Sequence, residues 1–164
     1  MNINYKEYVV SPQAAARARK ESLNKDLKNS IRGRENGYVA RLGEIAVAQA
    51  TGGTIKNTYD YDVVLKNGTK VDVKTKERTV DPKPHFEVSV ADFNTTQKCD
   101  AYYFVSVNTK SSPNTVSIVG WLSKDDFYKK AKFWKKGQID FNSENKFEFK
   151  ADCYNMECRY LNSL

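Results

Sequence analysis

The sequence predicts one α/β domain of the α+β class, a mixed β-sheet flanked by helices, and three observations support this. The chain has 164 residues, of which 40% are hydrophobic and 12% aromatic, which is enough for one domain with a core. Helical patterns come first, strand patterns dominate the middle, and a further helical pattern follows them. No repeat, low-complexity tract or linker divides the chain, so residues 1–164 are expected to form a single domain.

Three segments have the periodicity and the end signals of helices. Ser11 can cap the first helix with Pro12 at its first position, and Ser123 can cap the last. These helices are expected at residues 11–31, 35–50 and 123–136. The first helix belongs to a basic N-terminal extension, the other two belong to the core, and a C-terminal tail packs on that core. The three parts are expected at residues 1–34, 35–136 and 137–164.

Strand patterns occupy the region between the second and the last helix. The apolar run at residues 101–107 is typical of a central strand, and residues 91–98 are expected to form a short helix or a turn. From residue 138 onward the pattern predicts no particular element. The strands are expected at residues 60–65, 69–76, 85–90, 101–107 and 115–122.

The charge of the chain favours a polyanionic partner. The formal net charge is +7 and the pI about 9.2, which points to nucleic acid before an acidic membrane surface or an acidic protein. The sequence has neither a signal-peptide pattern nor a membrane-spanning run, so a cytoplasmic protein without a membrane partner is expected. The single histidine, His85, is expected to be structural. Free thiols in packing roles are expected at Cys99, Cys153 and Cys158.

The stretch YDYDVVLKNGTKVDVKTKE, residues 59–77, combines carboxylates and lysines with two strand patterns around an Asn-Gly turn. A two-residue loop would mix charged and valine side chains on both faces. A three-residue loop with Gly68 in the left-handed region sorts them, so we expect this register. The apolar face then holds Tyr61, Val63, Leu65, Val71 and Val73. The other face holds Asp60, Asp62, Asp72, Lys74 and Lys76, with Val64 and Lys70.

This register places Asp62 directly opposite Asp72. The Cβ atoms of such a pair lie about 5 Å apart, and two like charges at that distance need a cation between them. Mg²⁺ binds a few carboxylate oxygens together with water. Lys74, on the same face, can hold water or stabilise charge on a phosphate. The plain alternative is a solvated sheet surface on which Asp60 pairs with Lys74.

A glutamate on the second helix completes the arrangement. The helix carries Leu42-Gly43-Glu44; Asp62 follows on a strand, and Asp72-Val73-Lys74 comes after the tight turn. This order resembles the PD-(D/E)XK nuclease superfamily, which includes many restriction enzymes, archaeal-type Holliday-junction resolvases and phage nucleases. The resemblance covers residues 35–107 and, more loosely, the helix at 123–136. It implies a restriction-endonuclease-like mixed sheet flanked by helices, in the order αβββαβ.

The resemblance also implies a role for each of these residues. Asp62 is implied as the first metal-binding carboxylate and Asp72 as the second, with the Val73 carbonyl completing the shell. Lys74 is implied as the catalytic lysine, and Glu44 as an acid that binds a second metal ion or orients water. The metal would be Mg²⁺, with Mn²⁺ able to substitute.

The chain also departs from the pattern of the superfamily. Tyr61 stands where that pattern has a proline before the first acid, and Asp60 competes with Asp62 for the role of first acid. We prefer Asp62 because it is expected opposite the second acid. Gln97 and Tyr102 approach the Gln-x-x-x-Tyr signature of one branch of the superfamily, but the spacing is one residue longer, so that branch is not assigned.

The implied activity is that of a Mg²⁺-dependent DNA endonuclease that hydrolyses phosphodiester bonds. Alternatives are a Holliday-junction or branched-DNA resolvase acting as a homodimer, an inactive nucleic-acid-binding module, and a protein-interaction module. A phage or mobile-element origin would place it in the host cytoplasm. Plain alternatives remain for the first helix, as a solvated charged face, and for Glu44, as a surface salt bridge to Arg41. The candidates for contact with the DNA backbone are Arg17, Arg19, Lys20, Arg32, Arg34, Lys76 and Gln97.

Overall fold

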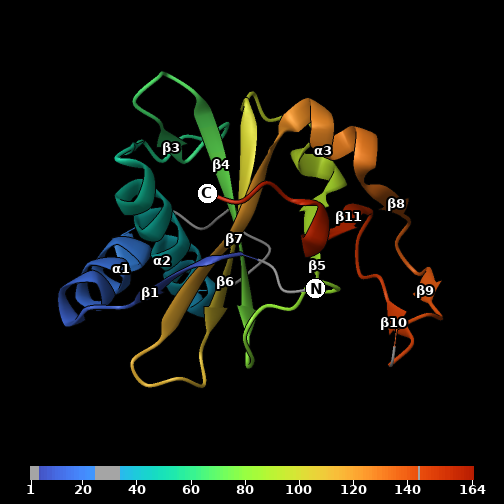
Figure 1. Cartoon of the computed structure of the whole chain (residues 1–164), viewed down its shortest axis with the longest axis horizontal. Coiled ribbons are helices and arrows are strands. Elements are labelled where there is room, and N and C mark those ends of the chain that lie inside the picture. The colour runs from blue at the N-terminus through green and yellow to red at the C-terminus, as the bar shows by residue number, and fades with distance from the viewer. Residues whose placement is uncertain (1–3, 25–33, 144) are drawn as a thin grey trace.

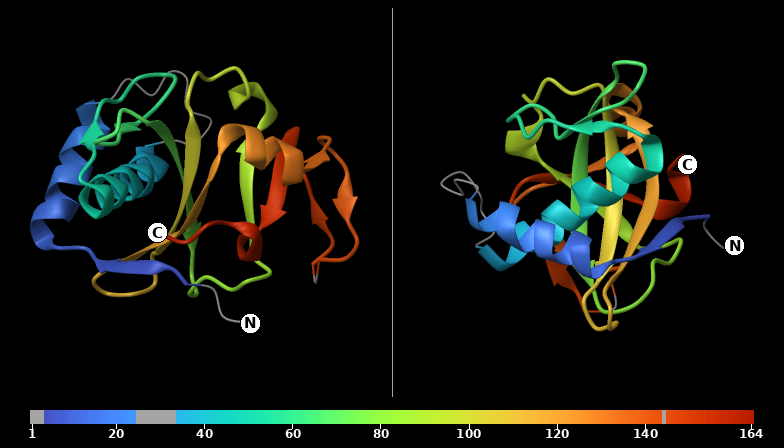
Figure 2. Two further views of the ribbon diagram at one scale, coloured as in Figure 1. Left: turned by 45° about the horizontal axis from the view of Figure 1, so that its top comes forward. Right: turned by 90° about the vertical axis from the view of Figure 1, so that its left-hand side faces the viewer.

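The computed structural model describes residues 4–24, 34–143 and 145–164. Its elements form layers: two helices cover one face of a mixed sheet (Figure 1), and a smaller sheet with a third helix lies on the other side (Figure 2). The predicted α+β class is confirmed. The helices are α1 (Pro12–Asn24), α2 (Arg34–Thr51) and α3 (Lys124–Lys130), with the 3-10 turns η1 (Asp92–Asn94) and η2 (Cys158–Tyr160).

The main sheet of the described residues has six strands in the order β1-β7-β6-β4-β3-β2. β4 and β6 run parallel at its centre, and the other neighbours are antiparallel. β6 is central and buried along residues 101–107, as its apolar run predicts. The strands are β1 (Lys6–Val9), β2 (Thr54–Ile55), β3 (Val63–Val64), β4 (Lys70–Arg78), β6 (Ala101–Asn108) and β7 (Thr115–Ser123).

A second sheet lies apart from the first and contains the strand expected at residues 85–90. This strand, β5, pairs with β11, which also pairs with β8. A two-stranded hairpin, β9 and β10, extends beyond them at the right of Figure 1. The strands are β5 (Glu87–Ala91), β8 (Lys132–Trp134), β9 (Ile139–Asp140), β10 (Phe147–Glu148) and β11 (Cys153–Glu157).

Local capping explains where two of the helices begin. The Ser11 hydroxyl accepts a hydrogen bond from the Ala14 N–H at 3.1 Å, and the Ser123 hydroxyl accepts one from the Asp126 N–H at 3.2 Å. Both serines are therefore N-caps, as the sequence predicts. The expected end of the first helix, at residues 25–31, lies outside the described residues.

The expected helix at residues 123–136 is too long and is corrected by the structure. Ala131 is extended, and α3 ends at Lys130. Phe133 then pairs in the small sheet with Tyr154, and the Trp134 ring stacks on Phe149 with centroids 4.5 Å apart. Contacts with the C-terminal part of the chain therefore override the helical pattern beyond Lys130.

The predicted hairpin register is confirmed between β3 and β4. Val63 pairs with Val71, the Leu65 N–H donates to the Thr69 carbonyl at 2.9 Å, and Gly68 has a φ of +88°. The strand expected at residues 60–65 is shorter, however, because only the two residues of β3 pair with β4.

The shorter strand changes the position of one aromatic side chain. Val63, Val71 and Val73 are buried beneath α2 in one core, together with residues of β6 and β7. Tyr61 was expected on the same face but packs against the second core, which holds Tyr102 and Phe104. The alternation of side chains fails at Tyr61 because this residue precedes the paired strand.

Gly43 allows α2 to approach β4 closely. A Cβ atom at this position would lie 2.0 Å from the Thr75 Oγ1, far inside van der Waals contact. Thr75 is a β-branched residue in a central strand, so it cannot move aside easily.

Replacing Gly43 with alanine is therefore expected to destabilise the fold by about 1–3 kcal/mol through overpacking, despite the better helix propensity of alanine. Urea denaturation measures the change in the free energy of unfolding. The Gly43→Ala/Thr75→Ala double variant removes the contacting oxygen and should recover part of the loss. A single variant as stable as the parent would show that the helix does not sit this close to the strand.

No helix among the described residues is long and apolar enough to cross a membrane.

Candidate functional site

The candidate site forms where β3 stops and the edge of β4 continues. The Asp62 N–H donates to the Val71 carbonyl at 2.8 Å, and the Asp62 Oδ2 accepts from the Val73 N–H at 2.8 Å. The Asp62 carboxylate thus accepts the hydrogen bond that a main-chain carbonyl of β3 would accept if that strand continued along β4. The N–H and C=O of a strand residue point to the same edge, so the Val73 carbonyl also lies on the side of Asp62.

β4 contributes Asp72 and Lys74, the acidic and basic residues of the Asp-x-Lys motif. Asp72 is only 4% exposed, and the Lys74 Nζ lies 2.6 Å from its Oδ2. The two groups form a buried ion pair, although this Asp72 oxygen accepts no well-aligned hydrogen bond from the described residues. The Lys74 Nζ also donates to the Gln97 Oε1 at 3.4 Å. The ammonium group is therefore held beside Asp72.

Glu44 approaches the site from α2 and is buried. Its Oε2 accepts a hydrogen bond from the Arg41 Nη1 at 2.6 Å. Arg41 is itself buried and also contacts Glu21 of α1 and the Asn57 Oδ1, the latter at 2.7 Å. The salt bridge considered as an alternative from the sequence is therefore present, but it lies inside the protein and joins α1, α2 and the loop before β3.

The electrostatics show that three carboxyl groups share one environment. The pKa of Asp62 is raised well above its ordinary value by burial, by the charge of Asp72 and by that of Glu44. The Val73 N–H and the Lys74 ammonium oppose this shift. Because the pKa of this carboxyl is higher in the folded than in the unfolded protein, its protonated form stabilises the fold at low pH. This stabilisation is complete below the ordinary pKa and is lost as the pH rises through the raised pKa. At neutral pH the site therefore favours a bound cation.

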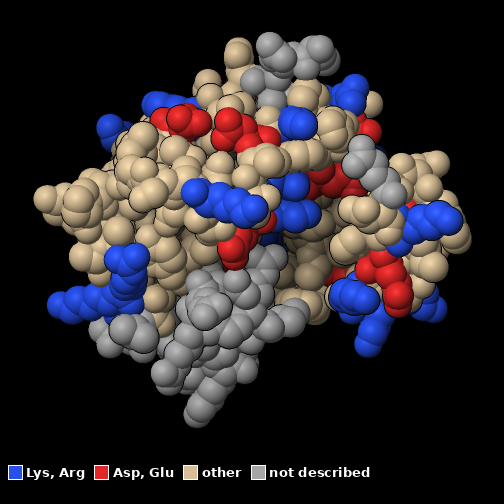
Figure 3. Space-filling model, turned by 90° about the horizontal axis from the view of Figure 1, so that it is seen from below, with Lys and Arg blue, Asp and Glu red and all other residues tan. Residues whose placement is uncertain are grey.

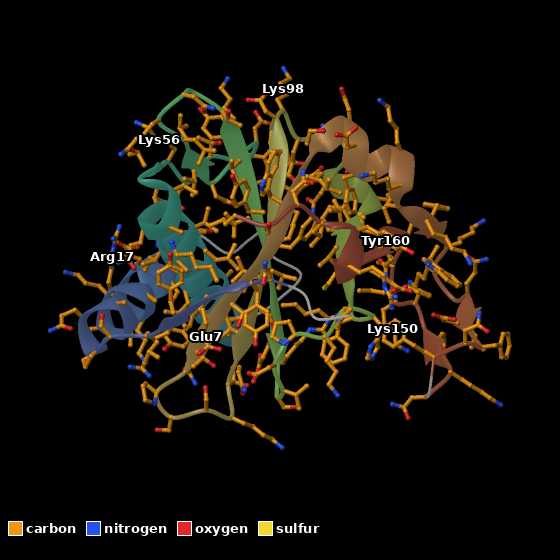
Figure 4. The ribbon with its side chains drawn as sticks, viewed as in Figure 1. Glu7, Arg17, Lys56, Lys98, Lys150 and Tyr160 are labelled. Carbon is orange, nitrogen blue, oxygen red and sulfur yellow. The ribbon has the colours of Figure 1, made fainter. Side chains whose placement is uncertain are left out.

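Asp60, the competing first acid, points elsewhere. Its Oδ1 accepts a hydrogen bond from the Lys98 N–H at 3.0 Å, in the loop before β6. Figure 4 shows Lys98 at the upper edge of the molecule. Asp62 and Asp72 were expected to face each other as a cross-strand pair, but both residues lie just beyond the paired part of the hairpin. The two carboxylates nevertheless interact, as the pKa of Asp62 shows.

Two of the candidate DNA contacts lie beside the site. Gln97 is 7% exposed, and its Nε2 donates to the Tyr59 carbonyl at 2.7 Å. Its role as a phosphate contact stays a prediction; in the structure the side chain is buried, and its Oε1 accepts the hydrogen bond from Lys74. Lys76, two residues beyond Lys74 on β4, is exposed.

The other candidates lie on or near the first two helices. Arg17 pairs with Glu21 at 2.8 Å and is half exposed, and Figure 4 shows it beside α1 at the left of the molecule. The Arg19 guanidinium lies over the Tyr38 ring, 5.0 Å from its centroid, and Lys20 is exposed. Arg32 and the side chain of Arg34 lie outside the described residues. Figure 3 shows Lys and Arg mixed with Asp and Glu on the lower face, so charge of one sign does not mark a DNA surface there.

The oxygen atoms of the site could supply some, but not all, of the ligands of a hard divalent cation. Asp62, Asp72 and the Val73 carbonyl offer oxygen ligands of the kind that Mg²⁺ prefers. Among the described residues, no three His, Cys, Asp or Glu side chains are arranged to hold a metal ion. Glu44 is bonded to Arg41, so two carboxylates, one carbonyl and water would have to form the shell.

The cysteines and the histidine are not among the predicted site residues, although the charges of Asp72 and Lys74 reach Cys99. Among the described residues the cysteines form no disulfide, as expected. Burial raises the pKa of the thiols of Cys99 and Cys158 to about 11, so neither is a nucleophile at neutral pH. His85 is exposed and its ring contacts Phe86 edge-on, with centroids 5.1 Å apart.

Comparison with known proteins assigns no family to the chain. A scan against protein-family models finds no match, and a search of curated proteins finds none either.

Proposed function

We propose that the chain is a Mg²⁺-dependent DNA endonuclease that hydrolyses phosphodiester bonds. One observation carries this proposal: Asp62, Asp72 and Lys74 come together at the edge of β4 beyond the end of β3. This is the arrangement that the resemblance to the PD-(D/E)XK superfamily implies. The net charge of +7 supports a polyanionic substrate.

Each residue of the site has a separate role in the proposed reaction. Asp62 and Asp72 would hold the metal ion together with the Val73 carbonyl. When bound, Mg²⁺ lowers the pKa of water and neutralises charge on the phosphate; Mn²⁺ should substitute. Lys74 offsets the negative charge that develops on the phosphate. Glu44, oriented by Arg41, orients the attacking water. A resolvase of the same fold and a cytoplasmic site of action stay predictions from the sequence.

The activity is tested by incubating the protein with supercoiled plasmid, linear duplex, single strands and a four-way junction. Cutting is expected with Mg²⁺ or Mn²⁺ and should stop with EDTA. The Asp72→Asn variant should lose activity at least a hundredfold, because it removes a ligand charge. Asp125→Asn, which changes an exposed acid at the start of α3, is the matched control and should cut like the parent.

Metal binding has a readout of its own. Mg²⁺ is expected to raise the melting temperature of the parent at neutral pH, because it binds the folded state alone. The Asp72→Asn variant should lose this shift and the Asp125→Asn variant should keep it. If the protein binds DNA without cutting it, and Mg²⁺ does not change its melting temperature, the catalytic proposal is contradicted and a nucleic-acid-binding module is favoured.

A further inference from the structure

A cavity of about 420 Å³ opens beside Lys74, between β4 and β6 on one side and the small sheet on the other. Its floor is apolar and includes Val88, Phe104 and Val119, which come from both sheets and are all buried. This size falls within the range of pockets that bind small ligands. An intact duplex is too wide to enter it, whereas a nucleotide turned out of the stack fits a pocket of this kind.

One wall of the cavity carries a row of cationic side chains that begins at Lys74. Lys74, Lys76 and Arg78 alternate along β4 and all line the cavity, as side chains on one face of a strand do. Lys76 lines the cavity together with Glu87 and Cys153, which belong to the small sheet. The Arg78 Nη2 donates to the Glu87 carbonyl at 3.1 Å. A row of cations of this kind suits a phosphodiester backbone.

The mouth of the cavity presents an exposed aromatic ring. Phe93, in η1, is 51% exposed and lines this cavity. It also lines a second cavity, of about 340 Å³, which carries Lys136 and Lys150 beside Asp92 and Asp152. The Asp152 Oδ1 accepts a hydrogen bond from the Lys136 N–H at 2.7 Å. Phe93 thus stands between two hollows that both contain lysines.

We propose that the cavity holds an unpaired nucleotide of the DNA, with its base against Phe93 and its phosphate near Lys76, next to the bond that is cut. This rests on the proposed function, and it names the substrate class: DNA with a single-stranded segment at the cutting site. Bases stack on exposed aromatic rings without regard to sequence. The onward strand leaves the cavity past Phe93, toward Lys136 and Lys150.

Binding without cutting tests this inference. The full chain in EDTA is titrated into a short fluorescein-labelled oligothymidylate, and separately into a blunt duplex of the same length, while anisotropy is recorded. Phe93→Ala should weaken binding of the single strand roughly tenfold, and Lys76→Ala should weaken it and reduce its salt dependence. Phe93→Ala should leave the affinity for duplex unchanged. Thymidine monophosphate should bind far more weakly than the oligonucleotide.

The controls replace an aromatic residue and a lysine outside both cavities. Tyr160 is 57% exposed, and Lys110 is exposed in the loop after β6. Tyr160→Ala and Lys110→Ala should bind the single strand like the parent. The inference is overturned if Phe93→Ala and Lys76→Ala bind the single strand as the parent does, or if they lose duplex affinity equally. Tight binding of the free mononucleotide would also overturn it.

The inference and the proposed function can fail separately. Phe93-dependent binding of single strands by a protein that never cuts would remove the endonuclease and keep the cavity as a nucleotide site. Cutting that continues while these variants bind normally would keep the endonuclease and remove the nucleotide site.

Discussion

Replacing Lys74 with alanine is expected to lower the rate of DNA cutting by about a hundredfold or more, the usual cost of removing one group that stabilises transition-state charge. The Lys74 ammonium lies 2.6 Å from the Asp72 carboxylate, and it opposes the rise in the pKa of Asp62 that burial and the charges of Asp72 and Glu44 cause. Its removal therefore takes away a charge near the phosphate and raises the pKa of Asp62 further. Residual activity should rise as the pH is raised, because more Asp62 is then ionised.

The measurement compares single-turnover cutting rates at several pH values. Lys70→Ala is the matched control: Lys70 lies on the same strand, is exposed, and its ammonium lies over the Tyr61 ring, 5.4 Å from the centroid. It should cut within a few-fold of the parent. Lys74→Arg keeps the charge but cannot give up its proton, so it separates electrostatic stabilisation from proton transfer. Normal cutting by Lys74→Ala would exclude the catalytic role.

Replacing Arg41 with alanine is expected to destabilise the protein by about 3–5 kcal/mol, the typical cost of leaving a buried charge without its partner. Arg41 and Glu44 are both buried, and the Arg41 Nη1 binds the Glu44 Oε2 at 2.6 Å and the Asn57 Oδ1 at 2.7 Å. The same guanidinium contacts Glu21 of α1. Its loss therefore releases α1 and the loop before β3 together.

Urea denaturation gives the free energy of unfolding for this comparison. Arg17→Ala is the matched control, because Arg17 also pairs with Glu21 but is half exposed, and such pairs contribute less than about 1 kcal/mol. The Arg41→Ala/Glu44→Gln double variant removes the uncompensated charge and should recover part of the loss. An Arg41→Ala variant no less stable than Arg17→Ala would contradict the buried network.

Part of the site follows from local sequence rules. The Asn67-Gly68 turn and the alternation of valines predict the pairing of Val63 with Val71, and the structure confirms it. Turn geometry and the burial of one face act over a few neighbouring residues, so they can be recognised in the sequence. The same local rules locate Asp72 and Lys74 on one strand.

Other parts of the site depend on contacts between distant segments. The helix projection pairs Arg41 with Glu44, but their burial also depends on Glu21 of α1 and on Asn57. The cavity beside Lys74 is lined by β4, by β5 together with η1, and by β11, which come from three regions of the chain. No periodicity in the sequence reports such distances.

The sequence by itself determined the α+β class, the helix caps and the hairpin register, because capping, turn chemistry and alternation of apolar residues are local. Only the tertiary structure decided where α3 ends, since Phe133 and Trp134 find partners far along the chain. It also decided that the Asp62 carboxylate accepts from the Val73 N–H, that Gln97 is buried beside Lys74, and that a cavity of about 420 Å³ adjoins them. Burial and long-range pairing are properties of the assembled layers, and they set the charge environment on which the proposed chemistry depends.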